Sequence, residues 1–311
     1  MKLKPIKIGK IKIKTPLFLA PMVDVTDLPY RLMCRKAGAG MACTEMLYLD
    51  AILHENPKTL RLQKTNSKDT PSGIQITGNT PSEFLKALPY LKKFDIVDIN
   101  CGCPSEKIIG NQAGSYLLNN PEKIEEIIKI LKSAGLTVTA KIRLGYNFNN
   151  ALKIAKMIEK AGADALTVHA RLATEGYDKK ADWNEIKKIK QALHIPVIGN
   201  GDILREEDVL AMLKIADGAM IARGAIGDPL IFKRTLHYLK TGKKIPFSFK
   251  ENIKSFKEYL QLSKKYDCID IPRMKYLGSK FIKNTEGAGK LRMQLMQLKT
   301  FEEIFNFVDN L

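Results

Sequence analysis

Two cysteines separated by one residue lie on a polar loop that directly follows an apolar, strand-like segment. Residues 94–99 are mostly isoleucine, valine and phenylalanine, and the loop continues as Asn100, Cys101, Gly102, Cys103 and Pro104. Because parallel α/β proteins gather their chemistry at the carboxyl ends of strands, we predict that Cys103 belongs to an active site. The alternative is a small buried hydrophobic residue, which a place on a loop disfavours. Cys101 fits either a side chain that faces the site or one that packs.

Residues able to contact a ligand follow most of the other strand-like segments, and we predict that they converge with Cys103. They are Pro21, Met22, Glu45, Gln75, Asn100, Lys141, Arg143, His169, Arg171, Asn200, Gly201, Asp202, Arg223 and Gly224. Lys141 falls inside an apolar run, so its ammonium group needs an anionic or carbonyl partner. A flavin ring would supply one, and a Schiff-base lysine is the alternative. His169 fits a ligand contact or a structural residue.

Two consecutive strand ends, residues 199–202 and 222–225, combine glycines with polar side chains. Glycines at such positions let backbone N–H groups approach a phosphate, and Arg223 adds positive charge. We therefore predict a phosphate site at Asn200-Gly201-Asp202 and Ala222-Arg223-Gly224. Ordinary loop glycines are the alternative.

The five cysteines are too few and too scattered for a disulfide framework in a chain of 311 residues. A C-x-C spacing without a second cysteine pair is a poor signal for zinc or an iron–sulfur cluster. No group of histidines and carboxylates has metal-ligand spacing. We therefore predict an enzyme without a metal.

Eight short apolar segments alternate with helix-like segments over the first 242 residues, which predicts a (β/α)8 TIM barrel. The expected strands are residues 16–20, 40–44, 73–77, 96–100, 138–142, 165–168, 196–199 and 218–222. A doubly wound sheet is the alternative, but it usually has fewer strands, and no Gly-x-Gly-x-x-Gly opens the first helix.

After residue 242 the alternation stops, and residues 248–311 predict a second, all-helical domain. The expected helices are residues 249–265, 272–283, 288–297 and 301–311. Residues 250–299 hold 12 lysines and arginines against five acidic residues, and the whole chain has a formal charge of +18. This balance favours a polyanion such as nucleic acid as partner. The alternatives are a lysine-rich composition spread evenly over the surface and a helical cap that only stabilises the barrel.

No apolar run approaches the roughly 20 residues that a membrane-spanning helix needs. Residues 1–7 lack the apolar core of a signal peptide. The expected location is the cytoplasm, and the expected oligomeric state is a monomer.

An ordered set of short motifs along the chain resembles that of the tRNA-dihydrouridine synthases. The motifs are Ala20-Pro21-Met22-Val23 with Asp27 and Arg31, Thr44-Glu45-Met46, Gln75-Ile76-Thr77-Gly78, Asn100-Cys101-Gly102-Cys103-Pro104 with Ala113-Gly114, Lys141-Ile142-Arg143-Leu144-Gly145, Val168-His169-Ala170-Arg171, Tyr177 with Ala181-Asp182-Trp183, Asn200-Gly201-Asp202-Ile203 and Ala222-Arg223-Gly224-Ala225. The chain departs from the family at residues 170 and 172–176 and at Cys101.

The resemblance implies FMN as cofactor and NADPH, or NADH, as reductant. By resemblance, Pro21, Met22, Gln75, Lys141 and His169 would hold the isoalloxazine, and residues 200–202 and 222–224 the ribityl phosphate. Asn100, Arg143 and Arg171 would contact the uridine. The implied reaction is hydride transfer from flavin N5 to C6 of a uridine in tRNA, with Cys103 giving a proton to C5. The basic helical domain, 248–311, would then bind tRNA.

Two rival functions fit parts of the sequence. One is a barrel flavoprotein that acts on a free pyrimidine, like the dihydroorotate and dihydropyrimidine dehydrogenases, although a small substrate needs no basic helical domain. The other is a non-catalytic tRNA-binding protein with a vestigial flavin site, which the presence of both Cys103 and Lys141 disfavours.

Overall fold

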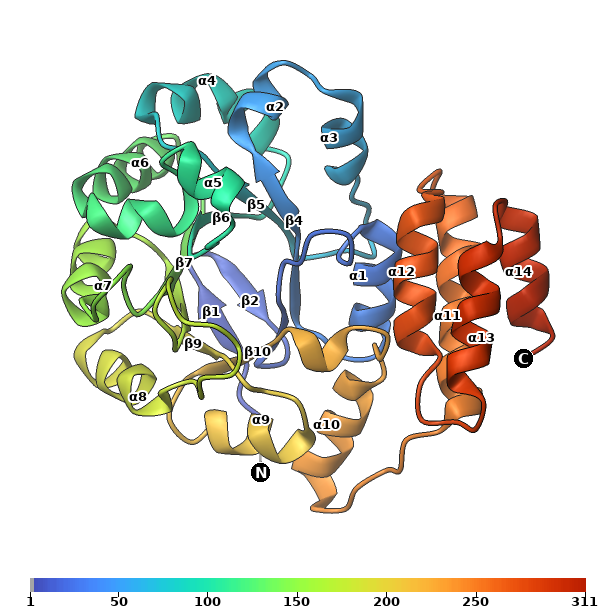
Figure 1. The fold of residues 1–311 in the computed structure, drawn as a ribbon. Coiled ribbons are helices and arrows are strands. Elements are labelled where there is room, and N and C mark those ends of the chain that lie inside the picture. The colour runs from blue at the N-terminus through green and yellow to red at the C-terminus, as the bar shows by residue number, and fades with distance from the viewer. Residues whose placement is uncertain (1–2) are drawn as a thin grey trace.

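A closed barrel of eight parallel strands forms the larger part of the computed structural model, which describes residues 3–311 (Figure 1). Met1 and Lys2, which the sequence-based boundaries include in the barrel, lie outside the described residues. The strand order is β10-β3-β4-β5-β6-β7-β8-β9, so the predicted (β/α)8 barrel is confirmed. The strands are β3 (Leu17–Leu19), β4 (Met41–Tyr48), β5 (Ser72–Thr77), β6 (Ile96–Cys101), β7 (Val138–Arg143), β8 (Ala165–His169), β9 (Val197–Asn200) and β10 (Gly218–Ile221).

Helices surround the barrel and follow the strands that they connect. They are α1 (Leu28–Lys36), α2 (Leu49–Leu53), α3 (Pro57–Leu62), α4 (Pro81–Leu91), α5 (Glu106–Gly110), α6 (Pro121–Ser133), α7 (Ala151–Lys160), α8 (Trp183–Ala192), α9 (Glu206–Met212) and α10 (Ile231–Thr241), with 3-10 turns η1 (Gly114–Asn119) and η2 (Arg223–Ala225). Their sequences explain the packing. In α6, proline occupies the first turn, and Ile124, Ile127, Ile128 and Leu131 form one buried stripe.

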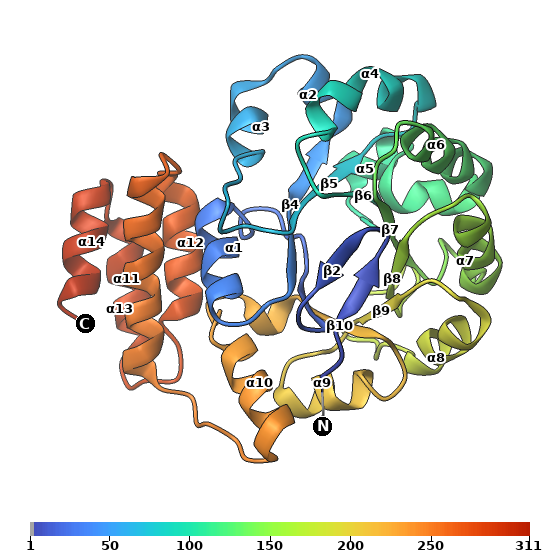
Figure 2. The same cartoon turned by 180° about the vertical axis from the view of Figure 1, so that it is seen from behind.

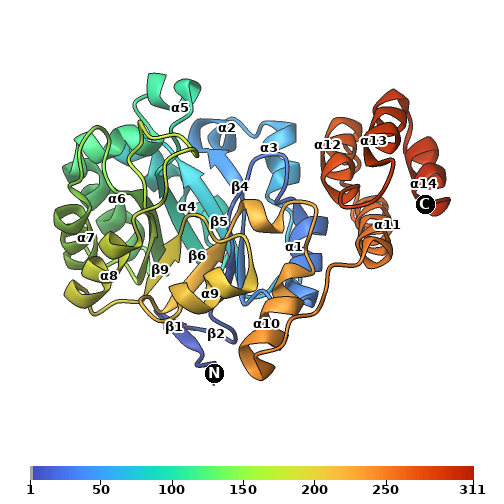
Figure 3. The ribbon, with the colours of Figure 1, turned by 60° about the horizontal axis from the view of Figure 1, so that its bottom comes forward.

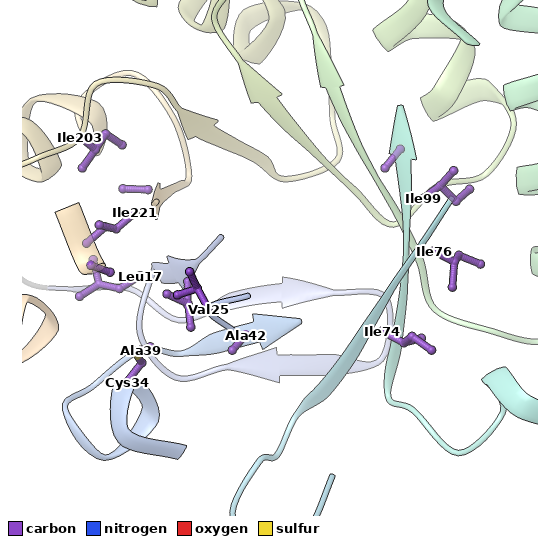
Figure 4. Close-up of a cluster of buried hydrophobic side chains, with 14 of the residues drawn as sticks. Leu17, Val25, Cys34, Ala39, Ala42, Ile74, Ile76, Ile99, Ile203 and Ile221 are labelled. Atoms are coloured by element: carbon purple, nitrogen blue, oxygen red, sulfur yellow. The ribbon is translucent and has the colours of Figure 1, made fainter. Parts of the chain in front are cut away.

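Side chains alternate along each strand between the barrel interior and the layer under the helices. Leu17 and Leu19 belong to the large core beneath the helices, whereas Phe18 belongs to a smaller cluster with Met220 and Ile198. Figure 4 shows part of the large core, to which several strands contribute side chains. The alternation is what a two-residue strand repeat requires when both faces are covered.

A two-stranded antiparallel hairpin, which the sequence analysis did not predict, closes the opposite end of the barrel from α5 (Figure 3). It consists of β1 (Ile6–Ile8) and β2 (Ile11–Ile13). Isoleucines alternate with lysines along both strands, and the buried isoleucines join the interior cluster of Phe18 and Met220. The hairpin therefore covers this end of the barrel with its apolar face and exposes lysines on its other face.

Four helices beyond the barrel form a bundle beside α1, as Figures 1 and 2 show. They are α11 (Phe249–Lys265), α12 (Ile271–Phe281), α13 (Ala288–Gln297) and α14 (Phe301–Asp309). Tyr30 of α1 packs edge-on against Tyr259 and Phe281, at ring-centroid distances of 6.2 and 6.3 Å. The bundle and the barrel thus share one apolar core. No helix within residues 3–311 is long and apolar enough to cross a membrane.

Candidate active site

A cavity of about 310 Å³ opens at the carboxyl ends of the barrel strands. This volume lies at the lower end of the range for small-molecule sites. All but three of the residues predicted for the site line it, and the exceptions are Glu45, Arg171 and Gly224. The lining predicted residues are Pro21, Met22, Gln75, Asn100, Cys103, Lys141, Arg143, His169, Asn200, Gly201, Asp202, Ala222 and Arg223. Residues far apart in sequence therefore converge, as the barrel topology requires.

Hydrogen bonds to backbone groups hold the Cys103 loop in place. The Asn100 side-chain oxygen accepts hydrogen bonds from the N–H groups of Gly102 and Cys103, at 3.1 and 2.9 Å. The Cys103 carbonyl accepts a hydrogen bond from Ser115, at 3.0 Å. Gly114 has a φ of +61°, and a Cβ there would lie 2.8 Å from the Cys103 carbonyl oxygen. Only glycine fits this close approach, which fixes where the thiol stands in the cavity.

A chain of buried hydrogen bonds behind the loop orients two amide side chains. The Gln75 amide nitrogen donates to Asp98 at 2.7 Å, and the Asn100 amide nitrogen donates to the Gln75 oxygen at 2.9 Å. Thr139 donates to the other Asp98 oxygen at 2.6 Å. Burial raises the pKa of Asp98, and the hydrogen bonds from Thr139 and Gln75 oppose that shift. Sequence reasoning missed Asp98, although a carboxylate inside an apolar strand was the signal for it.

Lys141 extends from β7 into the cavity. Burial lowers the pKa of Lys141 to about 8, with Arg143 as the next contributor. Within residues 3–311 its ammonium group forms neither a hydrogen bond nor an ion pair below 4 Å. A desolvated ammonium group of this kind is stabilised by an anionic ligand, so the predicted need for a partner remains in the protein alone.

His169 is neutral and its tautomer follows from its neighbour. Burial, together with the nearby cations Lys141 and Arg143, lowers the pKa of His169 to about 2. The Arg171 guanidinium lies 3.2 Å from Nε2 of His169. Because a guanidinium only donates, Nε2 accepts and the proton is on Nδ1. His169 therefore presents an N–H donor on its other edge.

Arg171, predicted to contact substrate, lies behind His169 and is buried. Its guanidinium donates twice to Asp202, at 2.7 Å each, and once to the Lys179 carbonyl at 2.6 Å. All of its nitrogens are thus engaged with the protein. These contacts connect Arg171 to His169 and Asp202, and its contact with substrate stays a prediction.

Arg143 lines the cavity and forms hydrogen bonds to two loops, the Cys103 loop and the loop after β8. Its Nε donates to the Gly102 carbonyl at 3.0 Å and Nη1 donates to the Leu172 carbonyl at 2.7 Å. It thereby connects the Cys103 loop to the loop after β8.

The predicted phosphate site has close backbone packing. Gly201 has a φ of +115°, and a Cβ there would lie 2.8 Å from the Ala181 Cβ and 3.1 Å from the His169 ring. Gly224 does not line the cavity, and a Cβ there would lie 2.9 Å from the Ile203 carbonyl oxygen. Arg223 pairs with Asp202 at 2.9 Å and is partly exposed to the cavity. This part of the cavity therefore offers a guanidinium and a tight backbone turn.

Two tyrosines at the cavity were not among the predicted site residues. Tyr177 lies under the Arg223 guanidinium at 4.1 Å and stacks on His169 at 6.4 Å. Tyr276 comes from α12 of the helical bundle. Tyr177 was part of a recognised motif, but nothing in the sequence placed Tyr276 near Cys103. Cys101 is fully buried in the core, which raises the pKa of its thiol, so it packs.

Comparison with known proteins identifies the family. A family model described as dihydrouridine synthase (Dus) matches residues 18–309. The chain belongs to the dihydrouridine synthase family. The tRNA-dihydrouridine synthase B of Pseudomonas putida is 38% identical to this dihydrouridine synthase family member over 248 residues, which cover 78% of this chain and 74% of the relative. The protein of the same name from Yersinia pestis is 37% identical over 253 residues, covering 77% of each chain.

The dihydrouridine synthase match extends from β3 to α14, so it includes every predicted site residue and the helical bundle. Among solved structures, the old yellow enzyme homologue from Zymomonas mobilis (NCR) has a TM-score of 0.55. It is 15% identical, and the alignment covers 80% of this chain and 95% of that one. At this identity the likeness concerns the barrel fold.

Proposed function

We propose that this dihydrouridine synthase reduces the C5–C6 double bond of specific uridines in tRNA, with FMN as cofactor and NADPH as reductant. One observation carries the proposal. A single cavity brings together the Cys103 thiol, the unpaired ammonium of Lys141 and Tyr276 of the helical bundle. The names of the relatives, which are tRNA-dihydrouridine synthases, support the same substrate.

The donor set of the cavity fits a flavin mononucleotide. Lys141 and the Nδ1–H of His169 would face the polar edge of the ring, while Pro21 and Met22 offer apolar surface. Arg223 and the turn at Gly201 would bind the phosphate. Bound FMN, after reduction by NADPH, would supply the hydride for C6 of the uracil.

The protein itself would contribute a proton, and the loop around Cys103 would orient the group that donates it. Addition of hydride to one carbon of the double bond leaves negative charge that a proton at C5 removes, and the Cys103 thiol would supply it. Asn100 and Gly114 hold the backbone of the loop, so the thiol stays at one position. Cationic side chains in a desolvated cavity stabilise the developing charge.

A tRNA substrate accounts for features that a free pyrimidine would not need. The base must leave its stack to enter a cavity at the carboxyl ends of the barrel strands. Single-stranded loops of RNA permit this at small energetic cost. The formal charge of +18 favours binding of a polyanion. Tyr276 offers an aromatic surface at the cavity on which a base can stack.

The test is nucleoside mass spectrometry on an unmodified tRNA transcript after incubation with the protein, FMN and NADPH. We expect uridine to gain two hydrogens only when all components are present. Oxidation of NADPH that responds to a free pyrimidine but not to tRNA would favour the rival flavoprotein. Bound flavin that NADPH reduces and tRNA never reoxidises would favour a non-catalytic tRNA-binding protein.

A further inference from the structure

A broad groove, here called the basal groove, lies on the side of the molecule where the β1–β2 hairpin is exposed (Figure 2). Its volume is about 930 Å³, larger than that of the active-site cavity. The hairpin, α1, the segment before β5 and the end of α11 form its walls. None of its lining residues also lines the active-site cavity. The two sites are therefore separate.

The basal groove is more basic than the rest of the chain. Seven of its 19 lining residues are lysine or arginine and two are acidic. In the whole sequence 51 of 311 residues are lysine or arginine and 33 are acidic. The acidic share is the same in both, whereas the basic share is more than doubled in the groove. The groove therefore concentrates basic residues relative to the chain as a whole.

Most of the positive charge in the groove has no carboxylate partner. Arg35 pairs with Asp69, and Lys36 pairs with Glu258. The remaining five form no ion pair with any residue in the described part of the chain; they are Lys10, Lys12, Lys14, Lys68 and Lys265. These five exposed ammonium groups are available to an external anion.

The hairpin places like charges opposite one another. In the β1–β2 register, Lys7 faces Lys12 directly, and both side chains are exposed. Like charges at directly opposed positions destabilise a hairpin. Burial of the isoleucines on the other face would be the same with neutral polar residues in place of the lysines. A polyanion bound beside Lys12, which lines the basal groove, would relieve this repulsion.

We propose that the basal groove binds the phosphodiester backbone of the tRNA substrate, as a second contact surface remote from the active-site cavity. This inference rests on the proposed function. Lysine is a strongly hydrated point charge suited to phosphates along a backbone. The helical bundle reaches both sites, since α12 contributes Tyr276 to the cavity and α11 contributes Lys265 to the groove. An RNA lying along the bundle meets both surfaces.

The test compares two triple variants in the full-length protein. Lys10→Gln/Lys12→Gln/Lys14→Gln removes three groove cations, and a matched control removes three exposed cations from α7 and α8 on the far side of the barrel. The control is Lys153→Gln/Lys156→Gln/Lys187→Gln. Binding of a labelled tRNA transcript is measured as a function of salt, without flavin or NADPH. Unchanged far-UV circular dichroism shows that both variants are folded.

Each lost phosphate contact flattens the dependence of log K on log salt by about 0.7 to 0.9. We therefore expect the groove variant to lose roughly two to three from the slope and the control variant to stay near the wild type. Equal slopes for the two variants would overturn the proposal. If the wild type forms no dihydrouridine but the slopes still differ, the proposed reaction fails and RNA binding in the groove stands.

A footprint on the unmodified protein gives an independent readout. Acetylation of lysines is measured by peptide mass spectrometry with and without tRNA. We expect tRNA to protect Lys12, Lys14 and Lys265 at least threefold and to leave Lys153 and Lys187 unchanged. Equal protection by poly(glutamate) of matched charge, or no protection by tRNA, would overturn RNA as the occupant of the groove.

Discussion

Replacement of Arg273 by methionine is expected to loosen the helical bundle from the barrel. Arg273 is buried on α12 and lies 3.2 Å from an Asp27 oxygen and 2.9 Å from a Glu45 oxygen. Both carboxylates belong to the barrel side, and both are only 2% exposed. The other Glu45 oxygen accepts a hydrogen bond from the Asp24 N–H at 2.9 Å, beside cavity residues Val23 and Val25.

The expected loss of stability follows from the charges left behind. Breaking a buried ion pair by removing one partner costs about 3–5 kcal/mol, because the other charge stays desolvated. Burial already raises the pKa of Glu45 to about 7, and the Arg273 charge opposes that shift. Burial likewise raises the pKa of Asp27, again opposed by Arg273. Methionine removes the opposing charge, so both pKa values rise further.

The sign of the pH dependence is fixed by these raised values. A carboxyl group with a raised pKa in the folded state retains a proton that the unfolded chain releases. Its contribution to stability therefore declines as the pH rises from about 4.5 to the folded pKa. Each further unit by which the variant raises a folded pKa adds about 1.4 kcal/mol to the decline. The variant's deficit is consequently larger at pH 8 than at pH 5.5.

Urea unfolding at the two pH values tests this, with circular dichroism and the fluorescence of the single tryptophan, Trp183 of α8, as probes. Lys36→Met is the matched control, since it breaks an exposed ion pair to Glu258 between α1 and α11 and is expected to cost less than about 1 kcal/mol. A deficit for Arg273→Met below about 1 kcal/mol, or one that is equal at both pH values, would refute the reasoning.

Two further predictions concern the cavity. Gly114→Ala is expected to lower the rate of dihydrouridine formation at least roughly tenfold with flavin content unchanged, because its Cβ would displace the Cys103 carbonyl. Gly135→Ala, also at positive φ but in open space, serves as its control, and equal rates for the two variants would contradict the account. Flavin affinity, measured by fluorescence quenching, is expected to fall as the pH rises through about 8, because Lys141 loses its proton there. A Lys141→Gln variant that keeps the same pH profile would exclude this cause.

The barrel and most of its site were predictable from the sequence because both depend on local pattern. Each apolar run is long enough to be a strand buried on both faces, and the topology then brings all carboxyl ends to one rim. Cys103, Lys141 and His169 were therefore placed in one cavity without knowledge of any distance. The convergence of strand ends at one rim predicts that these side chains lie close together, but it does not predict which of their atoms are in contact.

Features that depend on long-range packing were not predictable in the same way. Arg171 also follows a strand, but its guanidinium turns back to Asp202, which only the path of the loop after β8 determines. Tyr276 reaches the cavity because the bundle docks beside α1, a contact between segments more than 200 residues apart. The β1–β2 hairpin is different, since the alternation of isoleucine and lysine in both strands is itself a strand pattern in the sequence, and the hairpin was therefore predictable.

The most direct test of the central claim is a single-turnover reaction of the flavin-reduced protein with an unmodified tRNA transcript, comparing the wild type with Cys103→Ala. Dihydrouridine is counted by nucleoside mass spectrometry, and flavin content is measured on the same samples. The account predicts equal flavin content and a rate at least about 100-fold lower for the variant, which lacks the proposed proton donor. A Cys103→Ala protein that forms dihydrouridine at the wild-type rate would contradict it.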